Sequence, residues 1–167
     1  MENRLGLIAA VVIAVLISGC GQKPEDGVSE TESTPILTAA TLGEQNVLTV
    51  SEYQSAAPYS TANLSKGASL AQMCRACHSL DNGGPNMIGP ALFGFFGSDA
   101  GSREGFKYSP TMKETDFVWT PRALDAWLAQ PGRFLPGNRM TFAGVSQREQ
   151  RVDLIAYLLE ATTAGNK

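Results

Sequence analysis

Two of the chain's three cysteines and its only histidine lie in one short cluster, Cys74-Arg75-Ala76-Cys77-His78. With the remaining cysteine, Cys20, the whole chain has only four cysteine and histidine side chains. A structural zinc site usually takes four such ligands, so it would need all of them. Three cysteines close at most one bridge, which excludes a disulfide-rich scaffold.

The order Cys-x-x-Cys-His is typical of covalent attachment of a c-type haem. Two thiols three residues apart on one helical turn can each form a thioether with a haem vinyl group, and the next residue can present its imidazole to the iron. A thioredoxin-like dithiol is disfavoured because no βαβ pattern surrounds the motif. A disulfide would leave the adjacent histidine unexplained. We therefore predict one covalent haem c, bound by Cys74 and Cys77, with His78 as an iron ligand.

The second axial ligand cannot be a histidine, because the chain has no other, and the soft alternative is methionine. Four methionines lie beyond the N-terminal segments: Met73, Met87, Met112 and Met140. Met73 adjoins the attachment site and Met87 follows His78 closely, whereas Met112 and Met140 both have the reach. Met140 comes directly after a rigid Pro-Gly turn that would direct a side chain inward. We expect the methionines that do not bind iron to pack in the core.

The chain has 167 residues, of which 43% are hydrophobic and 17% charged, and its net charge is -3. These values exclude a disordered acidic chain and a basic nucleic-acid binder. Residues 5–17 form an uninterrupted apolar run that would span about 20 Å as a helix, too short for a bilayer core and typical of a signal peptide. The run ends in Leu16-Ile17-Ser18-Gly19-Cys20, which resembles a bacterial lipobox. We expect residues 1–19 to be a signal peptide and Cys20 to be lipidated; a simply cleaved signal and a retained anchor are the alternatives.

Residues 20–62 contain little apolar periodicity and carry a net charge of -5 to residue 61, and we predict a lipid-anchored, flexible, acidic tether. Within it, residues 47–50 could dock on the folded domain as a short strand.

Residues 63–167 have the composition of a compact domain with eleven basic and nine acidic residues. Three helices are predicted: one over 64–75, one beginning with Thr120 as N-cap and Pro121 at its first position and ending at Pro131-Gly132, and one opening with a capping box at 146–149 and running to about Thr163. The stretch from 82 to 105 holds seven glycines and two prolines and must be loop. We predict an all-α fold with three main helices and Gly-rich loops around the haem.

From Cys74 onward, over about 95 of the 167 residues, the chain resembles a class I cytochrome c close to the mitochondrial type. Upstream of the cysteines the resemblance weakens to Gly67 and Leu70. The matching motifs, at the family's spacing, are Cys74-Arg75-Ala76-Cys77-His78, Gly89-Pro90-x-Leu92-x-Gly94, Gly105-Phe106-x-Tyr108-Ser109, Trp119, Leu128-x-x-Pro131, Pro136-Gly137-x-x-Met140-x-Phe142-Ala143-Gly144 and Arg151-x-Asp153-Leu154-Ile155-Ala156-Tyr157-Leu158.

The resemblance implies a role for each matching position. His78 and Met140 would be the axial iron ligands, and the Pro90 carbonyl would accept a hydrogen bond from the His78 ring. Tyr108 and Trp119 would hydrogen-bond a haem propionate. In addition, Phe142 would screen the exposed haem edge, and Leu154 and Tyr157 would pack the last helix on the first. The chain departs from the family pattern at Trp127, where a tyrosine commonly bonds the methionine sulfur, and at Asn138, where threonine is common.

With both axial positions filled, the iron offers no open site, so we predict an electron-transfer protein and not an enzyme. It would be a monomeric one-electron carrier, taking electrons from a cytochrome bc-type complex to a terminal oxidase or a photosynthetic reaction centre. The alternatives are a peroxidase-like haem enzyme and a fixed electron-entry subunit of a larger oxidoreductase. Haem attachment by this motif requires export, so we expect the bacterial periplasm, with anchoring at the periplasmic face of the inner membrane and no nucleic-acid partner.

Overall fold

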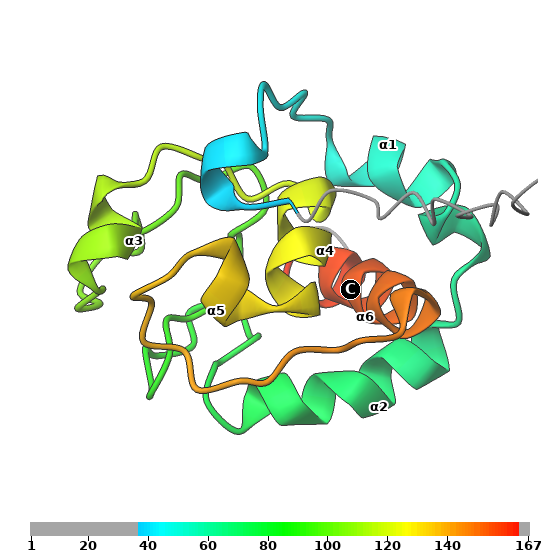
Figure 1. The fold of residues 1–167 in the computed structure, drawn as a ribbon. Coiled ribbons are helices and arrows are strands. Elements are labelled where there is room, and N and C mark those ends of the chain that lie inside the picture. The colour runs from blue at the N-terminus through cyan, green and yellow to red at the C-terminus, as the bar shows by residue number, and fades with distance from the viewer. Residues whose placement is uncertain (1–36, 164–167) are drawn as a thin grey trace, which may run out of the picture. The chain divides into compact units, whose positions relative to one another are not determined.

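The computed structural model describes residues 37–163, which fold into helices and loops (Figure 1). The helices within that range are η1 (Ala39–Thr41), α1 (Val50–Ser55), η2 (Tyr59–Thr61), α2 (Leu64–Arg75), α3 (Pro110–Glu114), α4 (Pro121–Ala129), α5 (Pro131–Phe134) and α6 (Arg148–Ala161), where η1 and η2 are 3-10 turns. The described residues contain no β-strand beyond one isolated antiparallel bridge between Asp99 and Val118. The predicted all-α fold is confirmed.

Helices α2 and α6 cross in close contact (Figure 1), and a glycine makes that approach possible. Gly67 of α2 is buried against α6, and a Cβ at this position would lie 2.1 Å from the Asp153 carbonyl oxygen. The Asp153 carboxylate also accepts a hydrogen bond from the Asn63 backbone N–H at 2.7 Å, where Asn63 is the N-cap of α2. Any larger residue at position 67 would therefore separate the two helices that form the centre of the fold.

Helix α4 begins as its sequence predicts. Thr120 is the N-cap, its hydroxyl accepts from the Ala123 N–H at 3.1 Å, and Pro121 occupies the first helical position. The helix ends at Ala129, but Pro131 does not terminate helical structure, since it opens the one-turn helix α5. Proline is tolerated there because the first turn of a helix needs no donor from it.

The capping box predicted at the start of α6 is wrong. The helix begins at Arg148, and its N-cap, Gln147, makes no side-chain cap. Instead, Arg151 in the first turn donates to the carbonyl oxygens of Val145 and Ser146 at 2.9 and 3.0 Å. A buried arginine thus binds the chain entering this helix, an arrangement that the local capping pattern does not predict.

The prediction of a flexible tether as far as residue 62 is wrong for residues 37–61, which fold onto the domain. We call this segment the N-terminal brace. Leu42 is only 1% exposed and belongs to the core, and Leu37, Val50 and Tyr53 pack against the same cluster. Burial of these apolar side chains offsets the entropy lost on ordering the segment. Residues 1–36, with the predicted signal peptide and Cys20, lie outside the described range.

The sequence had suggested a short strand at residues 47–50, but no strand forms there. Thr49 is instead the N-cap of α1 and makes a capping box with Glu52, in which the carboxylate accepts from the Thr49 N–H at 2.8 Å and the Thr49 hydroxyl accepts from the Glu52 N–H at 3.3 Å. The side chains of Val47 and Leu48 stay largely exposed.

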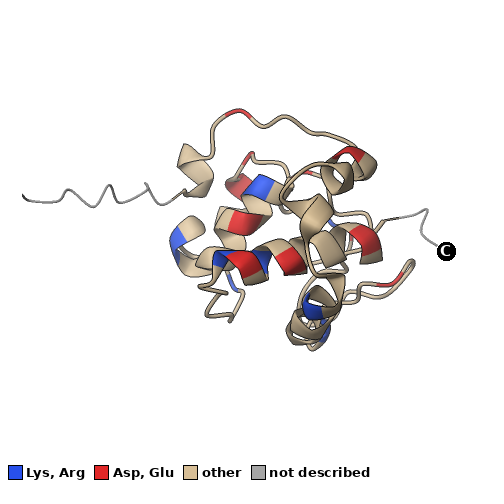
Figure 2. Cartoon of the chain, turned by 90° about the vertical axis from the view of Figure 1, so that its right-hand side faces the viewer, with Lys and Arg blue, Asp and Glu red and all other residues tan. Residues whose placement is uncertain are grey.

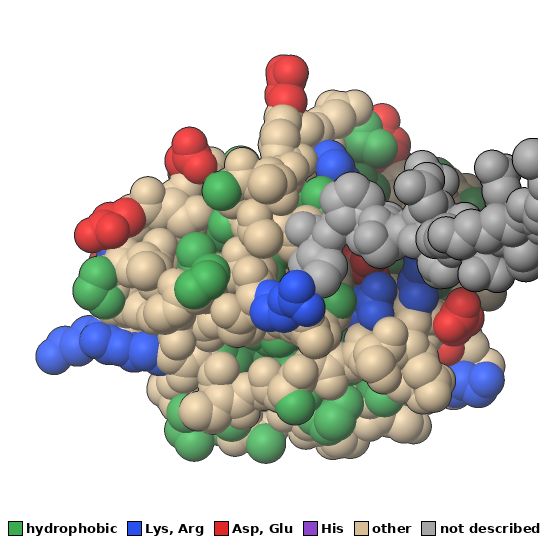
Figure 3. Space-filling model, in the orientation of Figure 1, with side chains coloured by type: hydrophobic (Ala, Val, Ile, Leu, Met, Phe, Trp, Pro, Cys, Tyr) green, Lys and Arg blue, Asp and Glu red, His purple; other side chains and the backbone are tan. Residues whose placement is uncertain are grey.

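Acidic and basic residues are mixed in both views of the charges. Figure 2 shows red and blue positions near one another, and the face drawn in Figure 3 also carries both signs. Within residues 37–163, no helix is both long enough and apolar enough to cross a membrane.

Candidate haem site

Helix α2 carries Cys74, and the turn that follows it carries Cys77. Cys74 lies in its last turn, and the Cys74 carbonyl accepts from the N–H groups of Cys77 and His78 at 3.0 and 2.9 Å, so the motif continues the helix by one turn. Both cysteines are free thiols and partly buried. Burial raises the pKa of Cys74 to about 11. The thiol is therefore protonated at neutral pH.

The orientation of His78 is set by the loop after it. Its Nδ1 lies 2.7 Å from the Pro90 carbonyl oxygen. A carbonyl oxygen can only accept, so Nδ1 carries the hydrogen and Nε2 is left with a free lone pair. Burial lowers the pKa of His78, and the bond to Pro90 opposes that change in part. A neutral imidazole with its lone pair on Nε2 is the form that binds iron.

Gly89 holds the loop against the histidine ring. Its N–H donates to the Cys77 carbonyl oxygen at 2.8 Å. A Cβ at position 89 would lie 2.2 Å from Cε1 of His78, so no other residue fits without moving the imidazole. The glycine belongs to a sequence motif, but its role could not be predicted from that motif, because only the fold shows how closely the ring approaches.

Met140 lies in the loop between α5 and α6, where it is partly buried and contacts the core cluster. Asn138 fixes its backbone: the amide oxygen accepts from the Met140 N–H at 2.9 Å, while the amide nitrogen donates to the carbonyl oxygens of Pro131 and Leu135 at 2.9 and 2.8 Å. Gly137 precedes it with a φ of +85°, a backbone conformation that favours glycine. The asparagine that departs from the family pattern thus links α5 to the methionine loop.

The far end of the same loop is fastened to α4. The Val145 N–H donates to the Leu128 carbonyl oxygen at 2.7 Å. Arg151 bonds the loop carbonyls described above and pairs with Asp125 of α4 at 2.8 Å. Arg151 was not predicted as a site residue, because its partners are 5 to 26 positions away in the sequence.

The remaining predicted site residues are partly buried aromatic side chains. Trp119 has edge contacts with Phe117 and Trp127, at ring distances of 4.8 and 5.5 Å. Tyr108 packs its ring edge on Phe106 at 4.8 Å, and burial raises the pKa of its hydroxyl. Phe142, two residues after Met140, also contacts the core while remaining partly exposed.

The other methionines separate into two groups. Met112 is 7% exposed and packs in the core as expected. Met73 and Met87 are each 46% exposed, so the expectation of core packing is wrong for them. Trp127, at the position where relatives commonly have tyrosine, is 5% exposed and packs against Trp119 and Phe134.

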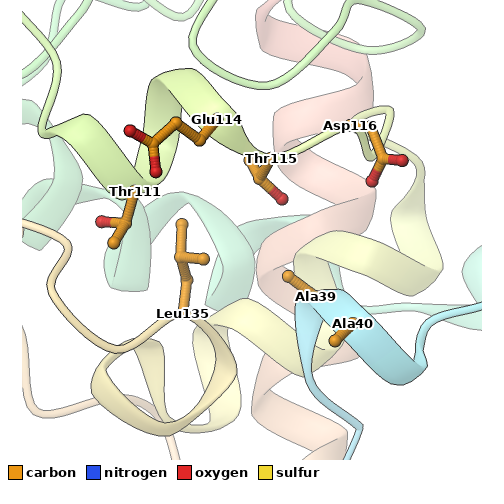
Figure 4. A pocket seen from close by; sticks show the side chains of 7 residues that line it. All are labelled: Ala39, Ala40, Thr111, Glu114, Thr115, Asp116 and Leu135. Carbon is orange, nitrogen blue, oxygen red and sulfur yellow. The ribbon is translucent and has the colours of Figure 1, made fainter.

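One pocket of about 300 Å³ lies away from these residues, beside α3 (Figure 4). It is lined by Ala39, Ala40, Thr111, Glu114, Thr115, Asp116 and Leu135. None of the predicted haem-site residues lines it, so it is distinct from the Cys-His site.

The residues around the Cys-His motif fit a haem. The two thiols follow each other on one helical turn, the His78 ring is held with Nε2 free, and a glycine leaves space at that ring. Several apolar side chains touch the core yet remain partly exposed, as expected where a large apolar group would cover them. They are Leu70, Leu92, Phe96, Tyr108, Trp119, Met140 and Phe142. An all-α fold with this motif and these supports defines a c-type haem protein.

Comparison with known proteins gives the same class. A 35% identical segment of 113 residues matches the cytochrome c2 of Blastochloris viridis, covering 68% of this chain and 89% of that protein. The cytochrome c of Theileria annulata is 41% identical over 99 residues, which cover 59% of this chain and 85% of the relative. A cytochrome c homolog of Bradyrhizobium diazoefficiens is 44% identical over 99 residues, but the match spans only 54% of its length. No family model matches the chain.

The chain belongs to the cytochrome c family. Members of this family are electron-transfer proteins, not enzymes, and carry a covalently attached haem c.

Proposed function

We propose that this protein is a one-electron carrier whose haem is attached through Cys74 and Cys77 and ligated by His78 and Met140. The observation that carries the proposal is the His78–Pro90 hydrogen bond of 2.7 Å next to two free thiols on the preceding turn. In attachment, each thiol adds its S–H across a vinyl double bond, so a C–S bond forms and the proton moves to the neighbouring carbon. When bound, the haem supplies an iron that alternates between ferrous and ferric states.

The chain's own residues orient the ligands and tune the iron. Pro90 keeps the His78 ring in one tautomer and one orientation. Asn138 and Arg151 hold the two ends of the Met140 loop. With His78 and Met140 as its two protein ligands, a bound haem iron would have a raised reduction potential and no open position for a substrate. Tyr108 and Trp119 would donate hydrogen bonds to a haem propionate, and Phe142 would cover the haem edge.

The test is spectroscopic and electrochemical. The purified full-length holoprotein is expected to be low-spin in both oxidation states at neutral pH, with a reversible one-electron wave at positive potential. Replacing Met140 with alanine should lower the potential and open the iron to added ligands, whereas Met112→Ala should not. A high-spin ferric iron in the unmodified protein would contradict the carrier function and favour a peroxidase-like one.

For partners, we propose reduction by a quinol-oxidising cytochrome bc-type complex and oxidation by a terminal oxidase or a reaction centre. The name of the Blastochloris viridis relative, cytochrome c2, is consistent with such a chain but belongs to that protein. Membranes that contain each complex should reduce or reoxidise the purified protein with a quinol or with oxygen. Failure of both reactions, with a normal reduction potential, would contradict the proposed partners only.

We further propose that Cys20 is lipidated and holds a monomeric domain at the periplasmic face of the inner membrane. Support comes from the residues before Cys20 and from the export that this haem motif requires. The 16 residues between Cys20 and Leu37 could reach at most about 60 Å. Intact mass of protein extracted from membranes would show one haem together with the lipid; haem without lipid would contradict the anchor.

A further inference from the structure

The N-terminal brace holds the backbone on both sides of Trp119. Gln45 uses both ends of its amide: Nε2 donates to the Val118 carbonyl oxygen at 3.1 Å, and Oε1 accepts from the Thr120 hydroxyl at 3.0 Å. The two partners of Gln45 are separated from it by 73 and 75 positions in the sequence. The two residues that Gln45 binds are the immediate neighbours of Trp119.

The Trp119 backbone is also paired with a facing segment that the brace touches. Its N–H donates to the Ser98 carbonyl and its carbonyl accepts from the Gly97 N–H, both at 2.9 Å. A Cβ placed on Gly97 would lie 3.5 Å from Cγ1 of Val47, so the brace passes within contact distance of this segment as well. The brace therefore lies close to both of the paired segments: Gln45 binds Val118 and Thr120, and Val47 lies beside Gly97.

The side chain of Trp119 has a donor to offer. Its ring is held by Phe117 and Trp127, and within residues 37–163 the structure records no hydrogen bond from its indole nitrogen. The aromatic cluster and the backbone together set the direction of the indole N–H. A backbone shift at position 119 would move the ring and change that direction.

We infer that Gln45 is a positioning residue for Trp119, so that the N-terminal brace adjusts the reduction potential of the haem through Trp119. This inference rests on the proposed hydrogen bond from Trp119 to a haem propionate. Negative charge near the iron favours the ferric state, and a donated hydrogen bond disperses that charge. Loosening Trp119 should therefore lower the potential.

The experiment compares Gln45→Ala with Gln54→Ala in the full-length holoprotein. Gln54 lies in α1 of the same brace, and no hydrogen bond of its side chain to the described residues is recorded. Two quantities are measured under conditions where both variants are fully folded: the midpoint potential, and the exchange rates of the Gly97 and Thr120 amide hydrogens. We expect Gln45→Ala to lower the potential and to speed both exchanges about tenfold, and Gln54→Ala to change neither.

A double-mutant cycle with Trp119→Phe tests the route of the effect. If Gln45 acts through Trp119, Gln45→Ala should not lower the potential further in that background. An equal shift in both backgrounds, or an unchanged potential in Gln45→Ala, would overturn the inference.

If Trp119→Phe alone leaves the potential unchanged, the proposed role of Trp119 fails and the tuning claim fails with it. The exchange rates then decide whether Gln45 positions the backbone. If Trp119→Phe yields no holoprotein, the comparison of Gln45→Ala with Gln54→Ala, which alters no residue of the haem site, still tests the effect of Gln45 on the potential and on the exchange rates.

Discussion

Individual residues around His78 leave almost no freedom for substitution. The imidazole is hydrogen-bonded to Pro90 on one side and lies so close to Gly89 that a Cβ there would be 2.2 Å from Cε1. Gly89 does not need a positive φ, so its requirement is one of space only. The contact explains why a glycine stands in this loop next to a proline.

Replacing Gly89 with alanine should displace the His78 ring, since the new methyl group would lie 2.2 Å from Cε1. We expect a loss of at least about 1–3 kcal/mol in the free energy of unfolding and a partly high-spin iron. Denaturant titration and the visible spectrum measure these two effects. Gly132→Ala is the control, because its Cβ would meet nothing within 4 Å; equal behaviour of the two variants would refute the steric explanation.

At the scale of elements, the methionine loop is bound at both ends by side chains and not by regular structure. Asn138 ties its start to α5, and Arg151 ties its end to α4 and α6. A loop held in this way can present a weak thioether ligand to the iron at small entropic cost, because its backbone is already ordered.

Arg151→Met should cost about 2–4 kcal/mol in the free energy of unfolding, because Asp125 and two loop carbonyls would lose their partner in a largely buried place. It should also weaken the bond from Met140 to the iron, measured as faster replacement of Met140 by added imidazole. Arg148→Met, an exposed position one turn earlier in α6, should leave both unchanged. Equal effects of the two substitutions would show that charge, and not the loop contacts, matters.

The brace is an element that the sequence analysis could not foresee. Its apolar residues have no regular period, and Leu42 is the one that reaches full burial. Its polar anchor, Gln45, bonds residues more than 70 positions away, and no local pattern encodes such a pairing. Helices α2, α4 and α6 were predictable because their apolar spacing is local, and at α4 the cap at Thr120 and Pro121 is local too.

Leu42→Ala tests whether the brace is part of the folded core. Leu42 is 1% exposed, so the substitution should lower the free energy of unfolding by about 2–5 kcal/mol. Leu48→Ala, in the same segment but 38% exposed, should lower it far less. A loss below about 1 kcal/mol at Leu42, by chemical denaturation, would mean that the brace is dispensable for stability.

The brace should also make stability depend on alkaline pH through Tyr59. Burial, and next the charge of Asp125, raise the pKa of Tyr59 to about 12 from 10.0. The folded state thus holds this proton more tightly than the unfolded state. Its contribution is fully present below pH 10 and is lost as pH rises through 12, and solvent screening at this partly exposed group keeps the loss below what the full shift implies. Tyr59→Phe should flatten that part of the stability curve; an unchanged slope would contradict the partly buried position of the hydroxyl.

For the whole molecule, the haem site was predictable to the extent that its chemistry is local in sequence. Cys74, Cys77 and His78 follow from one five-residue motif, and the His78–Pro90 contact expected from the family is present. The supports at Gly89, Asn138 and Arg151 depend on how separate segments meet, so only the fold could identify them. The sequence left both Met112 and Met140 within reach of the iron. The fold separates them, because Met112 is packed in the core whereas Met140 is partly exposed in a loop held at both ends.

The central claim is that His78 and Met140 together bind the iron of a covalently attached haem. The most direct test is NMR of the reduced full-length holoprotein, with the methionine methyl groups labelled. The methyl group of a methionine whose sulfur binds the haem iron would lie over the porphyrin ring, whose ring current would shift its signal far upfield. We expect one such signal, lost in Met140→Leu and retained in Met112→Leu. No upfield-shifted methyl signal in the unmodified protein, or one that persists in Met140→Leu, would contradict the claim.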